Sequence, residues 1–124
     1  MTRPLALFVY EKLLPGGPLV NRLQDLGYRV QSLSSPATLL DQAEVEKPLL
    51  VLADLEPRHE EVCAAIARLK ANVSTAHLPV IAFAAVSQAA AYEAARAAGA
   101  TLVVSDTAIV AHLTQFLDQA LQVD

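Results

Sequence analysis

The residues Pro48-Leu-Leu-Val-Leu-Ala-Asp-Leu-Glu-Pro57 give the clearest indication of the architecture of this chain. Its residues from Leu49 to Ala53 are apolar at successive positions, not at every second one. A strand with this pattern has both faces covered, which is typical of a parallel strand between two helical layers. Three further runs share this character: Leu5–Tyr10, Pro79–Ala84 and Thr101–Val104.

These runs alternate with longer segments of helical period, which predicts repeated strand-helix units. A fifth strand is expected at 28–33, where Tyr28, Val30 and Ser32 share one face and polar residues the other. That alternation is typical of an edge strand. With right-handed crossovers, we expect an α/β fold of the flavodoxin-like, doubly wound (βα)5 kind: a three-layer sandwich with a five-stranded parallel sheet of order 2-1-3-4-5.

The helices are predicted from apolar spacing and from the residues that begin and end them. The expected stripes and boundaries are Leu19, Leu23 and Leu26 closed by Gly27; a start at Ser35 and Pro36; Val62, Ile66 and Leu69; a helix opened by Ser87 and closed by Gly99; and Ile109, Leu113, Phe116 and Ala120 after an N-cap at Asp106. This gives five helices for five strands.

Length and composition indicate one domain, residues 1–124, because 124 residues with 54% hydrophobic content suit a single core. The formal charge is −4 and the basic residues are spread along the chain, so we expect no direct nucleic-acid partner. The lone cysteine, Cys63, lies on an apolar helix face and favours core packing in a reducing, cytoplasmic setting. The apolar run Leu5–Tyr10 is too short for a signal peptide or a membrane span.

In a doubly wound sheet the ligand crevice lies beyond the carboxyl ends of the strands. The residues expected there are Tyr10, Glu11, Asp54, Glu56, Ala84, Ser105 and Asp106. Carboxylates dominate this set.

Pro48–Pro57 resembles the strand and acceptor loop of a two-component response-regulator receiver domain, the CheY-like family. Thr75-Ala-His-Leu-Pro-Val-Ile81 is similar to the family's entry to the fourth strand. Ala94-Ala-Arg-Ala-Ala-Gly-Ala100 is similar to its Gly-Ala exit from the fourth helix. The resemblance covers nearly the whole chain and implies a role in two-component signal transduction or a phosphorelay.

The resemblance places the phosphoacceptor at Asp54 and the acidic pair that holds magnesium in the family at Tyr10 and Glu11. In this chain, the phenol of Tyr10 therefore stands where the family has one of the two carboxylates. The family's Ser/Thr after the fourth strand corresponds to Ala84, and its lysine on the fifth strand to Asp106. A carboxylate in place of that lysine reverses the charge that a phosphoryl dianion needs.

Further departures affect the signalling parts of the family. Its aromatic switch corresponds to Val103, and the proline after its lysine to Thr107. The loop Asp54–Pro57 is one residue shorter than is usual, which would shift the backbone carbonyl that helps to bind the metal. The resemblance is therefore to a degenerate member, a pseudo-receiver.

The leading hypothesis is a non-enzymatic protein-interaction module that works without phosphorylation and without a cofactor. In the family, the partner and dimer surface is formed by helix four, strand five and helix five. The corresponding residues here are Gln88, Tyr92, Arg96, Val103 and Thr107. We expect a protein partner on this face, a second copy of the chain included, and no contact with nucleic acid or membrane.

Two alternatives remain open. In the first, Asp54 is a working phosphoacceptor and Mg²⁺ is bound by Glu11, Asp54 and Glu56. In the second, the crevice binds a small ligand, as flavodoxin-like folds do. Structural duties also account for single residues: Asp54 as a strand-end carboxylate that accepts amide hydrogen bonds, and Asp106 as a helix cap. The three histidines, His59, His77 and His112, are not expected to converge on a metal.

Overall fold

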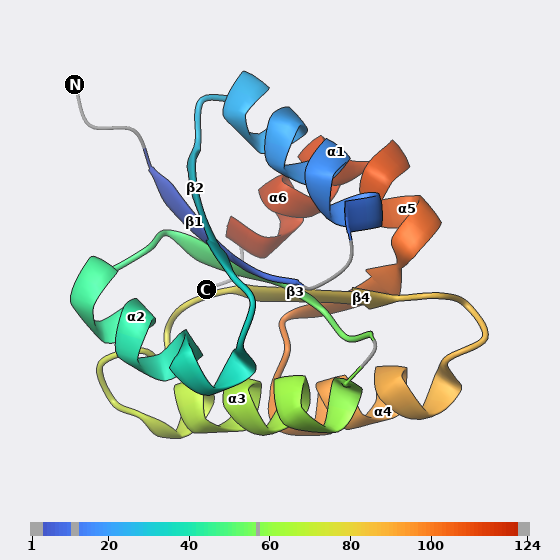
Figure 1. Cartoon of the computed structure of the whole chain (residues 1–124). Coiled ribbons are helices and arrows are strands. Elements are labelled where there is room, and N and C mark those ends of the chain that lie inside the picture. Colours follow the sequence, from blue (N-terminus) through green and yellow to red (C-terminus); the bar gives the residue numbers. More distant parts are fainter. Residues whose placement is uncertain (1–3, 11–12, 57, 122–124) are drawn as a thin grey trace.

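The computed structural model describes residues 4–10, 13–56 and 58–121 (Figure 1). The strands are β1 (Leu5–Val9), β2 (Arg29–Leu33), β3 (Leu50–Asp54), β4 (Val80–Ala84) and β5 (Leu102–Ser105). The helices are α1 (Leu13–Asp25), α2 (Leu39–Glu46), α3 (His59–Ala71), α4 (Ala89–Ala98), α5 (Asp106–Ala111) and α6 (Leu113–Leu121), with a 3₁₀ turn, η1 (Pro36–Thr38), before α2.

The strands form one parallel sheet of order β2-β1-β3-β4-β5, which confirms the predicted topology. β2 is an edge strand, and Arg29 and Ser32 on it are exposed. Because every strand runs in the same direction, all the carboxyl ends lie at one edge of the sheet. Asp54 at the end of β3 and Ala84 at the end of β4 are therefore neighbours there.

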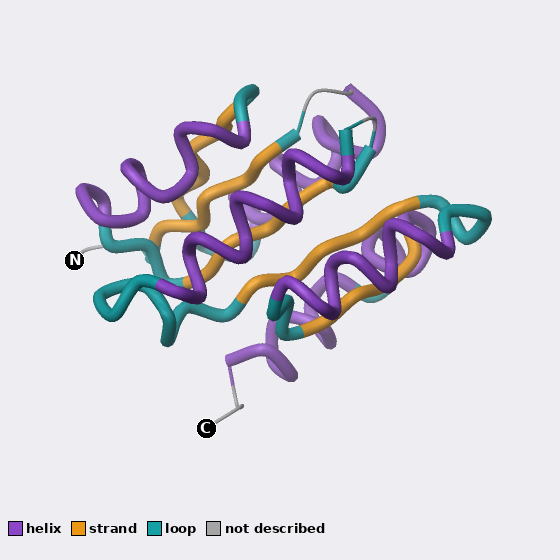
Figure 2. The backbone as a smooth tube through the Cα atoms, turned by 90° about the horizontal axis from the view of Figure 1, so that it is seen from below, coloured by secondary structure: helices purple, strands orange, loops and turns teal. Residues whose placement is uncertain are grey.

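Helices cover both faces of the sheet, as the unbroken apolar strands require. Figure 1 shows α1, α5 and α6 on one face and α2, α3 and α4 on the other, and Figure 2 shows helices lying along the strands. In β3, Val51 and Ala53 pack in the core beneath α2, α3 and α4. Leu50 and Leu52 pack in the core beneath α1, α5 and α6.

Two predicted glycine C-caps are confirmed. Gly27 (φ 95°) and Gly99 (φ 106°) both adopt the left-handed backbone region that L-amino acids with a side chain rarely enter. After α1 the amide of Tyr28 donates to the carbonyl of Leu23 at 3.0 Å, which satisfies a helix-end carbonyl.

The end of the chain differs from the sequence prediction. Asp106 is not the N-cap of the last helix: the cap is Ser105, whose hydroxyl accepts from the Ala108 amide at 3.1 Å, and Asp106 is the first helical residue. The expected single helix is two, α5 and α6, because His112 (φ −128°) leaves helical geometry between them. The apolar stripe continues across the break, since Ile109, Leu113 and Leu117 are buried on the same core.

Two predicted helix starts also shift. Ser35 makes no side-chain cap, and the helical segment opens as η1 with Pro36 at its first turn. Ser87 does not open α4, which begins at Ala89 after Gln88 and has no side-chain cap. Ser35 directly precedes η1 and Ser87 lies in the turn before α4, and sequence alone does not fix the residue at which the backbone becomes helical.

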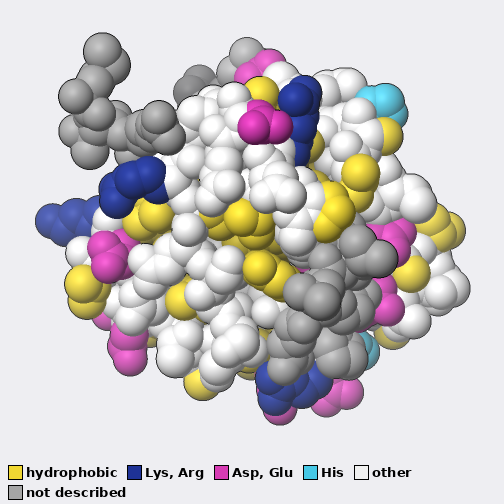
Figure 3. Space-filling view, turned by 45° about the horizontal axis from the view of Figure 1, so that its top comes forward, with side chains coloured by type: hydrophobic (Ala, Val, Ile, Leu, Met, Phe, Trp, Pro, Cys, Tyr) yellow, Lys and Arg dark blue, Asp and Glu magenta, His cyan; other side chains and the backbone are white. Residues whose placement is uncertain are grey.

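Charges of both signs are interspersed on the face drawn in Figure 3, with no single basic patch among the described side chains there. Cys63 is buried in α3, and burial raises the pKa of its thiol. Within the described ranges, no helix is both long and apolar enough to cross a lipid bilayer.

The positive φ of Gly99 predicts a graded cost of substitution. A Cβ there would be 3.0 Å from Cγ of Lys70, in addition to the left-handed strain. We expect Gly99→Ala to lower the free energy of unfolding by about 1–2 kcal/mol, and Gly99→Asn by less, because asparagine tolerates this region better. Urea denaturation measures both. Equal losses in the two variants would show that φ is not the cause.

Candidate functional site

Asp54 ends β3 at the carboxyl edge of the sheet, where the crevice was expected. It is 2% exposed, so the fold buries the side chain at the acceptor position. Its Oδ1 accepts a hydrogen bond of 3.0 Å from the amide of Glu56. This contact agrees with the structural interpretation of Asp54 as a strand-end carboxylate that orders the loop after β3.

Glu56 turns toward the next strand. Its Oε2 accepts a hydrogen bond of 2.8 Å from the amide of Ala85, directly after β4. The Glu56 side chain therefore crosses from the loop after β3 to the loop after β4. From the sequence Glu56 was expected only as a metal ligand, and no residue pattern predicts this contact to a backbone amide.

Tyr10 does not join the carboxylates. Its hydroxyl lies 3.3 Å from the hydroxyl of Ser32, on the edge strand β2. Its ring stacks obliquely against Phe8, with centroids 4.4 Å apart, and a Cβ at Gly16 would clash with the ring. Since β2 and β3 flank β1 on opposite sides, the phenol points away from Asp54. Glu11, the other residue of this expected pair, lies outside the described residues.

The other residues carried over from the resemblance lie at the ends of β4 and β5. Ala84 is fully buried and offers only a methyl group where the family has a hydroxyl. Asp106 is half-buried at the start of α5. Val103 is half-buried in β5 and packs against the core beneath α2, α3 and α4.

Tyr92 on α4, expected on the partner surface, also reaches the site. Its hydroxyl donates to the carbonyl of Ala84 at 2.9 Å, a contact that the sequence did not predict. Burial raises the pKa of its phenol, the carboxylates of Asp106 and Glu56 raise it further, and Arg96 opposes them. The phenol therefore lies within electrostatic range of two acids at the crevice. In the sequence, the only hint of this contact was a large polar side chain, Tyr92, within the alanine-rich segment Ala89–Ala98.

Two of the expected magnesium ligands, Asp54 and Glu56, already contact the backbone. Asp54 and Glu56 both accept hydrogen bonds from backbone amides. In the described portion of the chain, no three His, Cys, Asp or Glu side chains are grouped to hold a metal ion. The three-member set with Glu11 stays a prediction, because Glu11 is outside the described residues.

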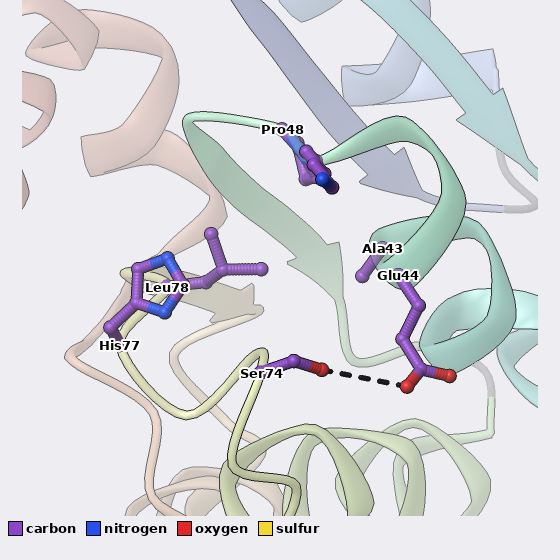
Figure 4. A pocket seen from close by; sticks show the side chains of 7 residues that line it. Ala43, Glu44, Pro48, Ser74, His77 and Leu78 are labelled. Atoms are coloured by element: carbon purple, nitrogen blue, oxygen red, sulfur yellow. Dashed lines mark hydrogen bonds between the residues drawn. The ribbon is translucent and has the colours of Figure 1, made fainter.

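A separate pocket of about 330 Å³ lies at the amino ends of the strands, far along the sheet from Asp54 (Figure 4). Its floor is apolar, with Ala43 and Leu78, and Glu44 on its rim accepts a hydrogen bond of 3.5 Å from Ser74. All of its polar rim side chains are exposed. This pocket is not the crevice that the small-ligand alternative requires.

The exposed part of the expected partner surface is a row along α4 and the start of α5. Gln88, Arg96 and Thr107 are exposed, while Tyr92 and Val103 are half-buried. The hydroxyl of Tyr92 is bonded to the carbonyl of Ala84, and the extent of the partner surface stays a prediction.

No protein-family model and no curated protein sequence matches this chain. Solved structures do. A protein of Chloroflexus aurantiacus assigned as a response regulator superposes with a TM-score of 0.86 at 20% identity, covering 97% of this chain and 98% of that one. The receiver domain of a sensor histidine kinase from Pseudomonas aeruginosa, with a magnesium ion coordinated in its active-site cleft, gives 0.85 at 19% identity, covering 98% and 100%.

A chemotaxis response regulator of Vibrio cholerae gives a TM-score of 0.82 at 17% identity, covering 97% of this chain and 100% of that one. At such identities the likeness establishes the fold. The chain has the CheY-like fold of response-regulator receiver domains, as its sequence predicted.

The surroundings of Tyr92 predict its titration. Because its pKa is raised above 10.0 in the folded protein, the stability that this group contributes is complete below pH 10.0 and is lost as pH rises through the folded pKa. We expect the tyrosinate absorbance missing from Tyr92→Phe to titrate above pH 10.0, and Asp106→Asn to move it downward. Asp41→Asn on α2 is the control. A difference titration at or below pH 10.0 would contradict this environment.

Proposed function

We propose that this chain is a receiver-like signal-transduction module that binds a protein partner and works without phosphorylation of Asp54. It is a non-enzymatic, pseudo-receiver member of its fold and needs no cofactor. One observation carries the proposal: the amide after β4, at Ala85, is already hydrogen-bonded to the carboxylate of Glu56.

Three further residues, Ala84, Asp106 and Tyr10, support a function without phosphorylation. A phosphoryl group on Asp54 would need hydrogen-bond donors and positive charge at the ends of the neighbouring strands. Ala84 offers no hydroxyl, and Asp106 brings negative charge where the family has lysine. Tyr10, in place of a carboxylate, lies toward β2. The fold is kept while the chemistry of phosphotransfer is not.

The partner surface proposed for this chain is the exposed part of α4 with the start of α5. Its side chains are Gln88, Arg96 and Thr107. β5, beside them, is the second edge strand of the sheet, and its apolar residues are half-buried. The partner bound by this surface is either a second copy of the chain or another signalling protein.

Phosphoryl mimicry tests the function directly. In an amide NMR spectrum, magnesium with beryllofluoride should leave the signals around Asp54 unchanged, and the spectra of wild type and Asp54→Asn should respond alike. Shifts that spread from Asp54 in wild type and vanish in Asp54→Asn would establish the alternative, a receiver that phosphorylation still switches. Asp41→Asn, at an exposed position on α2, controls for loss of one carboxylate.

A charge reversal tests the surface. Arg96→Glu should lower capture of the protein partner, or self-association measured by sedimentation, at least about tenfold, because a buried contact to an arginine often contributes more than 1.4 kcal/mol. Arg22→Glu on α1, in the other helical layer, is the matched control and should bind as wild type does. Equal binding by Arg96→Glu and wild type would place the partner elsewhere.

A further inference from the structure

One peptide unit at the end of β4 is held from both sides. Its carbonyl, from Ala84, accepts a hydrogen bond of 2.9 Å from the hydroxyl of Tyr92. Its N–H, from Ala85, donates to Oε2 of Glu56 at 2.8 Å. Carbonyl and N–H belong to the same planar group, so the two side chains fix the orientation of a single plane.

The two side chains come from different elements. Glu56 lies in the loop after β3, where its own amide is bonded to Asp54 and the amide of Leu55 donates to the carbonyl of Phe83 at 2.9 Å. Tyr92 lies on α4. An unbroken path of hydrogen bonds therefore runs from Asp54 through Glu56 and the Ala84–Ala85 peptide to Tyr92.

Among the described residues, few side-chain hydrogen bonds attach the start of α4 to the rest of the protein. Its first turn has no side-chain cap, and its buried residues are alanines, Ala91 and Ala95, which offer little shape to fix a helix position. The phenol of Tyr92 therefore adds a side-chain contact to the end of β4, beside the backbone hydrogen bond of 2.9 Å from the Gln88 amide to the carbonyl of Ala85. Rotation of the Ala84–Ala85 peptide would break both of its bonds together.

Glu56 acts in this arrangement as an anion does. Hydrogen bonds from an amide to a carboxylate are about twice as strong as those between neutral groups, and partial burial strengthens them. A negatively charged oxygen attached to Asp54 would approach the same edge of the sheet, where β3 and β4 end side by side. The carboxylate of Glu56 already occupies the amide there.

We propose that Glu56 is a built-in anion that, with Tyr92, clamps the Ala84–Ala85 peptide and thereby holds α4 in its partner-binding position without a phosphoryl group. The proposal rests on the proposed function, because it takes α4 as the partner surface. It adds the regulation of that surface: loss of the Glu56 contact releases the loop after β4 and, with it, α4.

Amide NMR and hydrogen exchange on the full chain, without partner, metal or phosphoryl mimic, test the clamp. We expect Glu56→Ala to accelerate exchange of the Ala85 amide at least about tenfold and to shift signals along α4, although the substitution lies in another element. Tyr92→Phe should shift the Ala85 amide as well. Glu46→Ala, at the exposed end of α2, removes the same charge and should leave Ala85 and α4 unchanged.

The double variant decides whether the two contacts form one device. If they clamp one peptide, Glu56→Ala with Tyr92→Phe should shift α4 no further than the larger single change. Glu56→Gln keeps an acceptor oxygen but loses the charge, so protection of Ala85 should fall between wild type and Glu56→Ala, which keeps the test decisive if Glu56→Ala does not fold. Changes confined to the loop after β3, or strictly additive effects, would overturn the clamp.

Failure of the clamp and failure of the proposed function give different results. The clamp is refuted if, in the unliganded protein, Glu56→Ala leaves the NMR signals of α4 unchanged. The proposed function fails only when beryllofluoride produces shifts that depend on Asp54.

Discussion

The central strands of the sheet are buried on both faces, and this burial governs where polar groups can lie. In β3, Leu50 and Leu52 face one helical layer, and Val51 and Ala53 face the other. No polar side chain can be placed along such a strand without a large desolvation cost. Chemistry is thereby restricted to the strand ends, and the parallel direction of the strands brings those ends to one edge.

At that edge, polar side chains hydrogen-bond to backbone groups of the neighbouring loops and strands. Asp54 orders the loop that carries Glu56, and Glu56 satisfies an amide after β4. Tyr92 satisfies the carbonyl of the same peptide from α4. Asp54 and Glu56, at positions that resemble a phosphorylation site, make structural contacts here. Through Tyr92 these contacts join the crevice to α4.

The strands and their order were predictable because they depend on local composition. Runs such as Pro79–Ala84 are apolar at every position, and β2 alternates, so central and edge strands are distinguishable from residue type alone. Helix ends at Gly27 and Gly99 were predictable because few other residues adopt a positive φ. The cap at Ser105 was not, because Ser105 and Asp106 are adjacent and both can cap a helix.

The residue pattern alone was enough to predict the layered fold, the edge of the sheet at which a site is expected, and the methyl group of Ala84 and the carboxylate of Asp106 at the strand ends. The directions in which Glu56, Tyr10 and Tyr92 point became known only from the packing of the folded chain. Their partners, Ala85, Ser32 and Ala84, lie on other elements or are backbone atoms that every residue possesses. Sequence pattern records which side chains are present, whereas a contact to a distant backbone group depends on how strands and helices pack.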